Sequence, residues 1–142
     1  MQDLSLIKSQ ERVKTKGEVY TPPELVNEML DKLPPEMWEN SKTYLDPACG
    51  NGNMLLEVYR RKMKYDHSPY DIAKTTYGIE IMEDNVVECK QRLSELLGKY
   101  IDMFAPDCIT ATIIKKDCNQ LIDQNIKCAD SLEVDWEEMF DV

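Results

Sequence analysis

The stretch that decides the fold is Asp46-Pro47-Ala48-Cys49-Gly50-Asn51-Gly52-Asn53. It lies between residues 43–45, which end a predicted strand, and residues 54–64, whose apolar positions recur at helical spacing. Glycines at such a junction let the backbone turn sharply and approach a ligand, and the following helix begins with unpaired N–H groups. A Gly-x-Gly turn on its own is also typical of a tight turn without a ligand. The stretch therefore predicts an α/β unit with a candidate binding turn after a strand.

The rest of the chain continues this alternation of helices and strands. A helix is predicted over residues 22–33, with Thr21 and Glu24 placed to form a capping box at its start. The other predicted elements are a second strand over residues 75–81, a helix over 85–97 that stops at Gly98, at least one helix within 99–125, a third strand over 125–128 and a turn into a fourth strand near residue 140. The pattern predicts one α/β domain over residues 17–142, preceded by a polar arm over residues 1–16.

Two acidic residues follow the second and third predicted strands. Glu80 closes the second strand, where nucleotide-binding α/β folds place a carboxylate that accepts hydrogen bonds from ribose hydroxyls. Asp130 follows the third strand, where a carboxylate can accept from an adenine amino group. Either residue alone is more often an exposed surface position or a helix cap. Their order after the glycine turn predicts a nucleotide-like ligand.

The charge balance bears on the kind of partner that the chain can bind. Asp and Glu number 27 against 17 Lys and Arg, which gives a formal net charge of −10. A nucleic-acid-binding surface is normally basic, because it must neutralise phosphates. If DNA is the substrate, this segment is not the part that grips it.

Cysteine, histidine and apolar patterns exclude several other classes of protein. The five cysteines are odd in number and form no Cys-x-x-Cys pair, so reduced thiols are expected and a zinc site is not. The single histidine, His67, lies in a polar stretch and is expected to be solvated, which disfavours a histidine-assisted nucleophile. No apolar run approaches the ~20 residues of a membrane helix, and no secretory signal is visible, so a cytoplasmic protein is predicted.

Four segments together resemble, in order, the cofactor motifs of adenine-amino DNA methyltransferases of restriction–modification type. They are Gly17-Glu18-Val19-Tyr20-Thr21-Pro22-Pro23, residues 46–53, Gly78-Ile79-Glu80-Ile81 and Ala129-Asp130. The resemblance covers roughly residues 14–142. It implies S-adenosylmethionine as cofactor and a three-layer αβα, Rossmann-like methyltransferase fold.

The resemblance also implies a role for each matching residue. Tyr20 and Thr21 would contact the methionine end of the cofactor. The glycine-rich cradle would be lined by Asp46, Ala48 and Gly50. The nucleoside end would be bound by Glu80 at the ribose, Ile81 against the adenine ring and Asp130 at the adenine amino group.

The sequence departs from the family at the catalytic motif. Members place Asn-Pro-Pro-Tyr or Asn-Pro-Pro-Phe at the end of the fourth strand, where it binds the target amino group and stacks on a flipped base. This motif does not occur in the chain, which ends at Val142. We therefore expect a domain truncated near its fourth strand, with no catalytic residue, no activity alone, and DNA contacted only through a missing region or a partner chain.

The sequence also allows other hypotheses about the function of the chain. It could be a stand-alone protein that sequesters the cofactor or pairs with an intact methyltransferase, or a small enzyme that degrades S-adenosylmethionine. A sheet cut before its fourth strand would expose an edge that another chain can pair with. We expect either a homodimer or a complementing methyltransferase subunit to cover it, or else a tail that folds back with Trp136, Met139 and Phe140.

Overall fold

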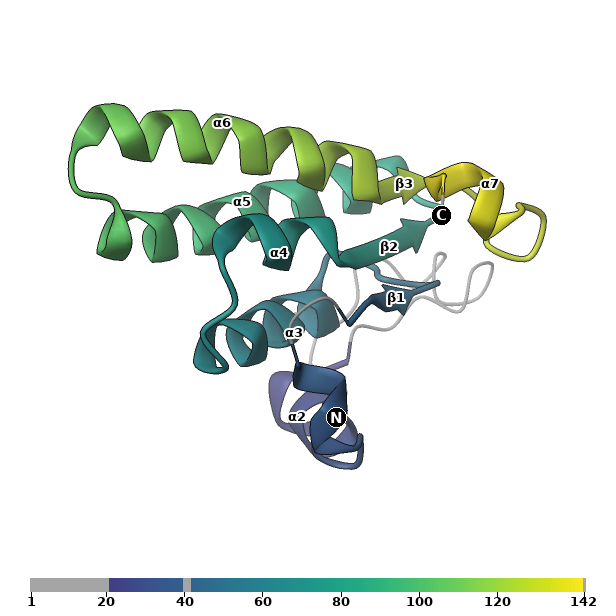
Figure 1. Ribbon diagram of the computed structural model, residues 1–142. Coiled ribbons are helices and arrows are strands. Elements are labelled where there is room, and N and C mark those ends of the chain that lie inside the picture. The colour runs from purple at the N-terminus through teal and green to yellow at the C-terminus, as the bar shows by residue number, and fades with distance from the viewer. Residues whose placement is uncertain (1–20, 40–41, 142) are drawn as a thin grey trace.

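The structure is a computed structural model that describes residues 21–39 and 42–141. Its sheet has three parallel strands in the order β1-β2-β3, with the bounds β1 (Tyr44–Asp46), β2 (Thr76–Glu80) and β3 (Ile126–Cys128). Asp46 lies opposite Gly78, and Glu80 lies opposite Cys128. The carboxyl ends of all three strands therefore meet at one edge of the sheet, on the right in Figure 1.

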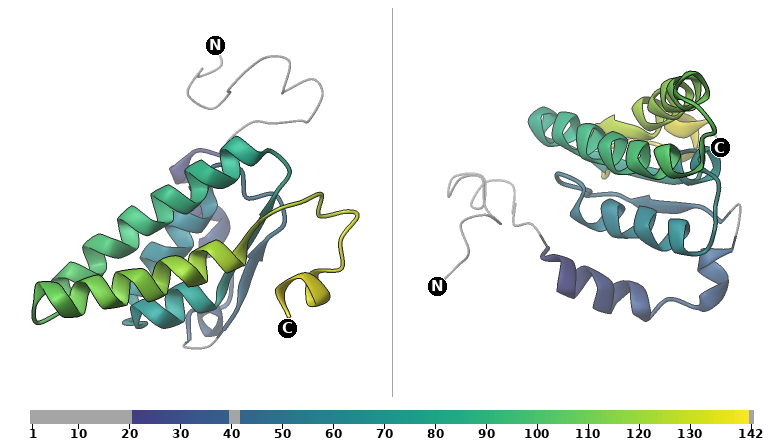
Figure 2. Two further views of the ribbon diagram at one scale, coloured as in Figure 1. Left: turned by 90° about the horizontal axis from the view of Figure 1, so that it is seen from above. Right: turned by 90° about the vertical axis from the view of Figure 1, so that its left-hand side faces the viewer.

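Helices connect and cover these strands. In chain order they are α2 (Pro23–Asp31), the 3-10 helix η2 (Pro35–Trp38), α3 (Asn53–Lys64), α4 (Pro69–Lys74), α5 (Glu83–Phe104), α6 (Cys108–Asn125) and α7 (Trp136–Phe140). The long helices α5 and α6 follow β2 and precede β3 in the chain. They run side by side as an antiparallel pair (Figure 1). Figure 2 shows that α3 lies between this pair and α2. The fold is thus a mixed α/β domain built on a small parallel sheet.

The core forms where the helices pack on each other and on the sheet. The larger buried cluster joins α3, α4, α5, α6 and β3, and the smaller one consists of Val26, Leu30, Trp38 and Val58. β2 packs so closely against its neighbours that a Cβ on Gly78 would lie 2.8 Å from the Leu55 side chain and 2.9 Å from the Cys49 sulfur. Glycine at this position therefore lets α3 and the turn before it approach the sheet.

The three strands and the helices α2 and α3 confirm the sequence predictions to within a few residues, but four other local predictions are wrong. The helix expected to stop at Gly98 continues to Phe104, because Leu93, Leu97 and Ile101 form one buried stripe across the glycine. The segment near residue 140 is the helix α7 rather than a strand, because the Asp135 carboxylate accepts from two backbone N–H groups and caps it.

The predicted capping box of α2 does not form. The N-cap residue is Pro22, and no side chain of the described residues caps the helix.

His67 is buried instead of solvated. Its Nε2 lies 2.6 Å from the Trp38 carbonyl oxygen, to which it donates. The polar residues around His67 predicted an exposed loop. The chain reverses between α3 and α4, and this reversal buries the His67 ring against η2.

The tail after β3 folds back on the domain. Phe140 packs edge-on against Tyr77 of β2, with ring centroids 4.9 Å apart. The indole of Trp136 donates to the Ser131 carbonyl. Trp136 and Phe140 thereby come to lie beside β1 and β2, where they line a hollow of about 230 Å³ with Leu45 and Tyr77. This agrees with the predicted fold-back of Trp136 and Phe140, while self-association stays a prediction.

Among residues 21–39 and 42–141, the structure shows neither a membrane-spanning helix nor a cluster of metal ligands. None of the helices there is long and apolar enough to cross a membrane. No group of three or more His, Cys, Asp or Glu side chains is arranged to hold a metal ion within those same residues.

Candidate cofactor site

The carboxyl edge of the sheet brings most of the predicted site residues together. Backbone hydrogen bonds extend the strand pairing beyond the strands themselves, since Cys49 N donates to Ile79 O at 2.9 Å and Ala129 N donates to Glu80 O at 3.0 Å. The chain segments that follow β1, β2 and β3 are therefore held next to one another. They carry Asp46, Ala48, Gly50, Glu80, Ile81 and Asp130. Tyr20 lies outside the described residues.

The glycine turn has the backbone geometry that its sequence predicts. Gly50 and Gly52 have φ angles of +56° and +99°, in the left-handed region that favours glycine. A Cβ on Gly52 would also lie 2.9 Å from the Cys89 sulfur, so the turn is pressed against α5. No larger side chain fits this position without displacing its neighbours.

The start of α3 has no side-chain cap among the described residues. Gly52 is its N-cap residue. The positive end of the helix dipole therefore faces the turn, an arrangement that favours a carboxylate or phosphate. Next to it, the buried Oδ1 of Asn51 has no hydrogen-bond partner within the part of the chain that the structure describes. An orphaned acceptor beside unpaired donors fits a ligand that carries both a negative group and an N–H donor.

Glu80 is positioned as a partly satisfied acceptor. Its side chain is only 8% exposed, and its Oε2 accepts from Met82 N at 3.1 Å and Asn85 Nδ2 at 3.0 Å. No donor from the described residues reaches the other oxygen, Oε1. The carboxylate is thus fixed in orientation by two hydrogen bonds and keeps one oxygen for a hydroxyl donor.

Asp46 lies close enough to Glu80 for their charges to interact. Burial raises the pKa of the Asp46 carboxyl, its hydrogen bond from Ala48 N lowers the pKa, and the negative charge of Glu80 raises it. That hydrogen bond, 3.1 Å long, orients Oδ1 toward the turn. Two neighbouring carboxylates favour a ligand with hydrogen-bond donors or positive charge at this place.

The remaining predicted residues flank this pair. Ile81 follows Glu80 with 44% of its side chain exposed, which leaves an apolar surface for a flat ring to pack on. Asp130 follows β3, and its Oδ1 accepts from Leu132 N at 3.0 Å to close the next turn. The structure therefore places both residues at the site's edge, and Asp130 also has a local structural role.

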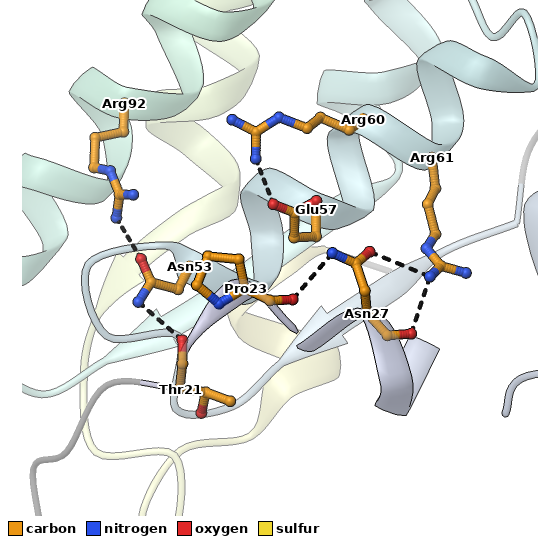
Figure 3. Close-up of polar contacts among 8 residues, drawn as sticks. All are labelled: Thr21, Pro23, Asn27, Asn53, Glu57, Arg60, Arg61 and Arg92. Atoms are coloured by element: carbon orange, nitrogen blue, oxygen red, sulfur yellow. Dashed lines mark hydrogen bonds and ion pairs between the residues drawn. The ribbon is translucent and has the colours of Figure 1, made fainter. Parts of the chain in front are cut away.

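A polar network that the sequence analysis did not predict joins the glycine turn to α5 and to the segment before α2 (Figure 3). Arg92 of α5 donates to Asn51 O at 2.9 Å and to Asn53 Oδ1 at 2.8 Å. Asn53 in turn donates through Nδ2 to the carbonyl of Thr21, at 3.0 Å. Arg92 lies on the same side of α5 as Cys89, one turn earlier, and that helical spacing was the only signal in the sequence.

Comparison with known proteins identifies relatives of the region that holds this site. The family described as N-6 DNA Methylase matches residues 6–95. The type II methyltransferase M.VspI of Vibrio sp. is 38% identical over 82 residues, which are 58% of this chain and 18% of that protein. The type I restriction enzyme MjaVII methylase subunit of Methanocaldococcus jannaschii is 49% identical over 65 residues, 46% of this chain and 9% of that protein.

These relatives are much longer than the chain. It spans less than a fifth of the length of either one. No solved structure matches it.

Proposed function

The chain belongs to the N-6 DNA methylase family, and from that premise we propose that it carries the S-adenosylmethionine-binding part of an adenine-amino DNA methyltransferase. One observation carries the proposal. A glycine turn with an uncapped helix start follows β1, and a buried carboxylate with a spare oxygen ends the adjacent parallel strand β2. One extended ligand could contact both. The three-layer, Rossmann-like arrangement of such methyltransferases is part of this proposal.

The methionine end of the cofactor is assigned to the glycine turn. Its carboxylate fits the uncapped N–H groups of α3, and its ammonium fits acceptors such as the Asp46 carboxylate. Ala48 and Gly50 line the turn with small or absent side chains, and Thr21 approaches from the segment before α2. Tyr20, its neighbour in sequence, is assigned to the same end of the cofactor. When bound, S-adenosylmethionine supplies an electrophilic methyl group.

The nucleoside end is assigned to the edges of β2 and β3. Glu80 Oε1 accepts from the ribose hydroxyls, because its partner oxygen is already held by Met82 and Asn85. Ile81 packs on the adenine ring, and Asp130 accepts from the adenine amino group with the oxygen that Leu132 does not use.

We assign no residue of this chain to methyl transfer. An Asn-Pro-Pro-aromatic motif does not occur among its 142 residues, and its net charge of −10 is unlike a DNA-gripping surface. In the proposed enzyme, the target base and the DNA backbone are therefore bound by another region or by a partner chain. One relative is itself described as a subunit of a type I restriction enzyme.

Calorimetry with S-adenosylmethionine tests the cofactor assignment. Glu80→Ala is expected to weaken binding by about 1–3 kcal/mol, because hydrogen bonds to a buried charged acceptor are lost. Glu95→Ala removes the same charge from an exposed position of α5 and should leave the affinity unchanged. Wild-type chain that does not bind, or equal affinities of wild type and Glu80→Ala, would contradict the assignment.

A further inference from the structure

Two arginine-centred networks fasten α2 to the rest of the domain (Figure 3). The first, which we call the loop anchor, consists of Arg92, Asn53 and the Thr21 carbonyl. The second, the helix anchor, consists of Arg61 of α3 with Asn27 and Asp31 of α2. The loop anchor lies at the glycine turn, and the helix anchor lies farther along α2.

The loop anchor fixes which way the Asn53 amide points. Arg92 Nη1 donates to Oδ1 of Asn53 at 2.8 Å, so the oxygen end of the amide must face α5. The NH₂ end then faces the opposite way and donates to the Thr21 carbonyl at 3.0 Å. Because Arg92 cannot accept a hydrogen bond, a flipped amide would lose both contacts.

This arrangement joins three segments that are remote in sequence. Arg92 also donates to the Asn51 carbonyl at 2.9 Å, so it holds the turn backbone and the amide at once. Thr21 lies immediately before α2, whose Val26 N–H donates to the Pro22 carbonyl. The position of the segment before α2 therefore depends on the glycine turn through one oriented side chain.

We propose that Asn53 and Arg92 are positioning residues that hold the Thr21 segment against the glycine turn and thereby set the affinity for the methionine end of S-adenosylmethionine. This role rests on the proposed function. It concerns the methionine end alone, because the hydrogen bonds of the loop anchor go to residues 21, 51 and 53 and none goes to Glu80 or Asp130. The ribose and adenine contacts are therefore expected to be independent of it.

Two ligands separate this role from a general loss of structure. Methylthioadenosine keeps the nucleoside and the sulfur of S-adenosylmethionine but lacks its amino-acid part. Asn53→Ala is expected to weaken S-adenosylmethionine binding about tenfold, as for the loss of one oriented hydrogen bond, and to leave methylthioadenosine binding unchanged. Asn53→Asp should behave in the same way, because a carboxylate can pair with Arg92 but cannot donate to Thr21.

The matched control is Asn27→Ala, which removes the Asn27 side chain from the helix anchor, while Arg61 keeps the Asn27 carbonyl and Asp31 as partners. Its side chain accepts from Arg61 and donates to the Pro23 carbonyl, and it does not touch the glycine turn. We expect both affinities to remain as in wild type. Equal weakening of both ligands by Asn53→Ala, or no weakening of either, would overturn the positioning role.

A measurement without ligand distinguishes this role from the proposed function itself. Amide hydrogen exchange at Val26 should be faster in Asn53→Ala than in wild type, because the start of α2 loses its tie to the turn. Faster exchange with no binding of either ligand by wild type would confirm the anchor but overturn the proposed function and the role that rests on it. Unchanged exchange together with unchanged affinities would overturn the anchor as well.

Discussion

At the scale of single residues, Lys62 has the most unusual environment. Its side chain is buried, and Nζ donates to the Thr75 carbonyl and to the hydroxyls of Thr75 and Thr76 at 2.8–3.3 Å. Burial lowers the pKa of this ammonium from 10.5 to about 8, although the charge of Asp71 partly opposes the shift. Lys62 thus ties the middle of α3 to the start of β2 at a cost in desolvation.

The free energy of unfolding should therefore rise with pH between about pH 8 and 10.5. In that window the folded state has released the Lys62 proton, whereas the unfolded state still binds it. The free energy of unfolding therefore increases as the pH rises from about 8 to 10.5, and this contribution is lost as the pH falls back through 8. The rise due to Lys62 should be on the order of 3 kcal/mol. Urea unfolding of wild type and Lys62→Met at several pH values measures it.

The comparison must be a difference between variants, because other groups titrate in the same range. Burial also raises the pKa of Tyr44 to about 12 and that of Cys118 to about 11, and both shifts lower stability as the pH rises. These contributions cancel between wild type and variant. Lys64→Met, at an exposed position of the same helix, should keep the wild-type slope, and an equal slope in Lys62→Met would refute the assignment.

At the scale of elements, the sequence predicts what depends on local pattern and misses what depends on packing. The glycine turn and the three strands follow from residue types within each segment, such as the left-handed Gly50 and the β-branched residues of β2. The short helix α4 was not predicted, although Ser68 caps it through its hydroxyl. Its two buried residues, Ile72 and Ala73, are too few to give a visible period.

In the candidate site, too, features set by local sequence were predictable, and features set by packing were not. The place of Glu80 at the carboxyl edge of the sheet was predictable, because it ends β2 and its position is a matter of chain order. The orientation of its carboxylate was not, since it depends on the Asn85 amide. Arg92 could not have been assigned at all, because its acceptors lie about 40 residues away in sequence.

Gly98 in α5 and Gly78 in β2 allow a direct test of whether glycine is required at each position for stability. A Cβ at Gly98, inside α5, would meet only the Lys115 side chain at 3.7 Å, which is ordinary contact. Gly98→Ala should stabilise the domain by roughly 0.5–1 kcal/mol, since alanine favours the helix. Gly78→Ala should destabilise it by about 1–3 kcal/mol through overpacking against Leu55 and Cys49. Urea denaturation measures both, and a destabilised Gly98→Ala would show that α5 is strained there.

At the scale of the whole molecule, the proposed function predicts that the chain binds S-adenosylmethionine but does not transfer its methyl group. The chain has a candidate cofactor site but no Asn-Pro-Pro-aromatic motif to accept the target amino group and stack on a flipped base. We expect no transfer of labelled methyl groups from S-adenosylmethionine to mixed duplex DNA by the 142-residue chain. Incorporation that disappears in Gly50→Trp would show that a catalytic site had been overlooked.

The long antiparallel pair α5–α6 also governs how the site can assemble as the chain folds. Contacts within this pair are close in sequence, so their loop-closure cost is small, whereas β3 can join β2 only after the whole pair has been traversed. Helical contacts of this kind form faster than parallel strand pairing. We therefore expect the β3 side of this edge, which carries Asp130, to be completed late in folding, after the two helices have formed.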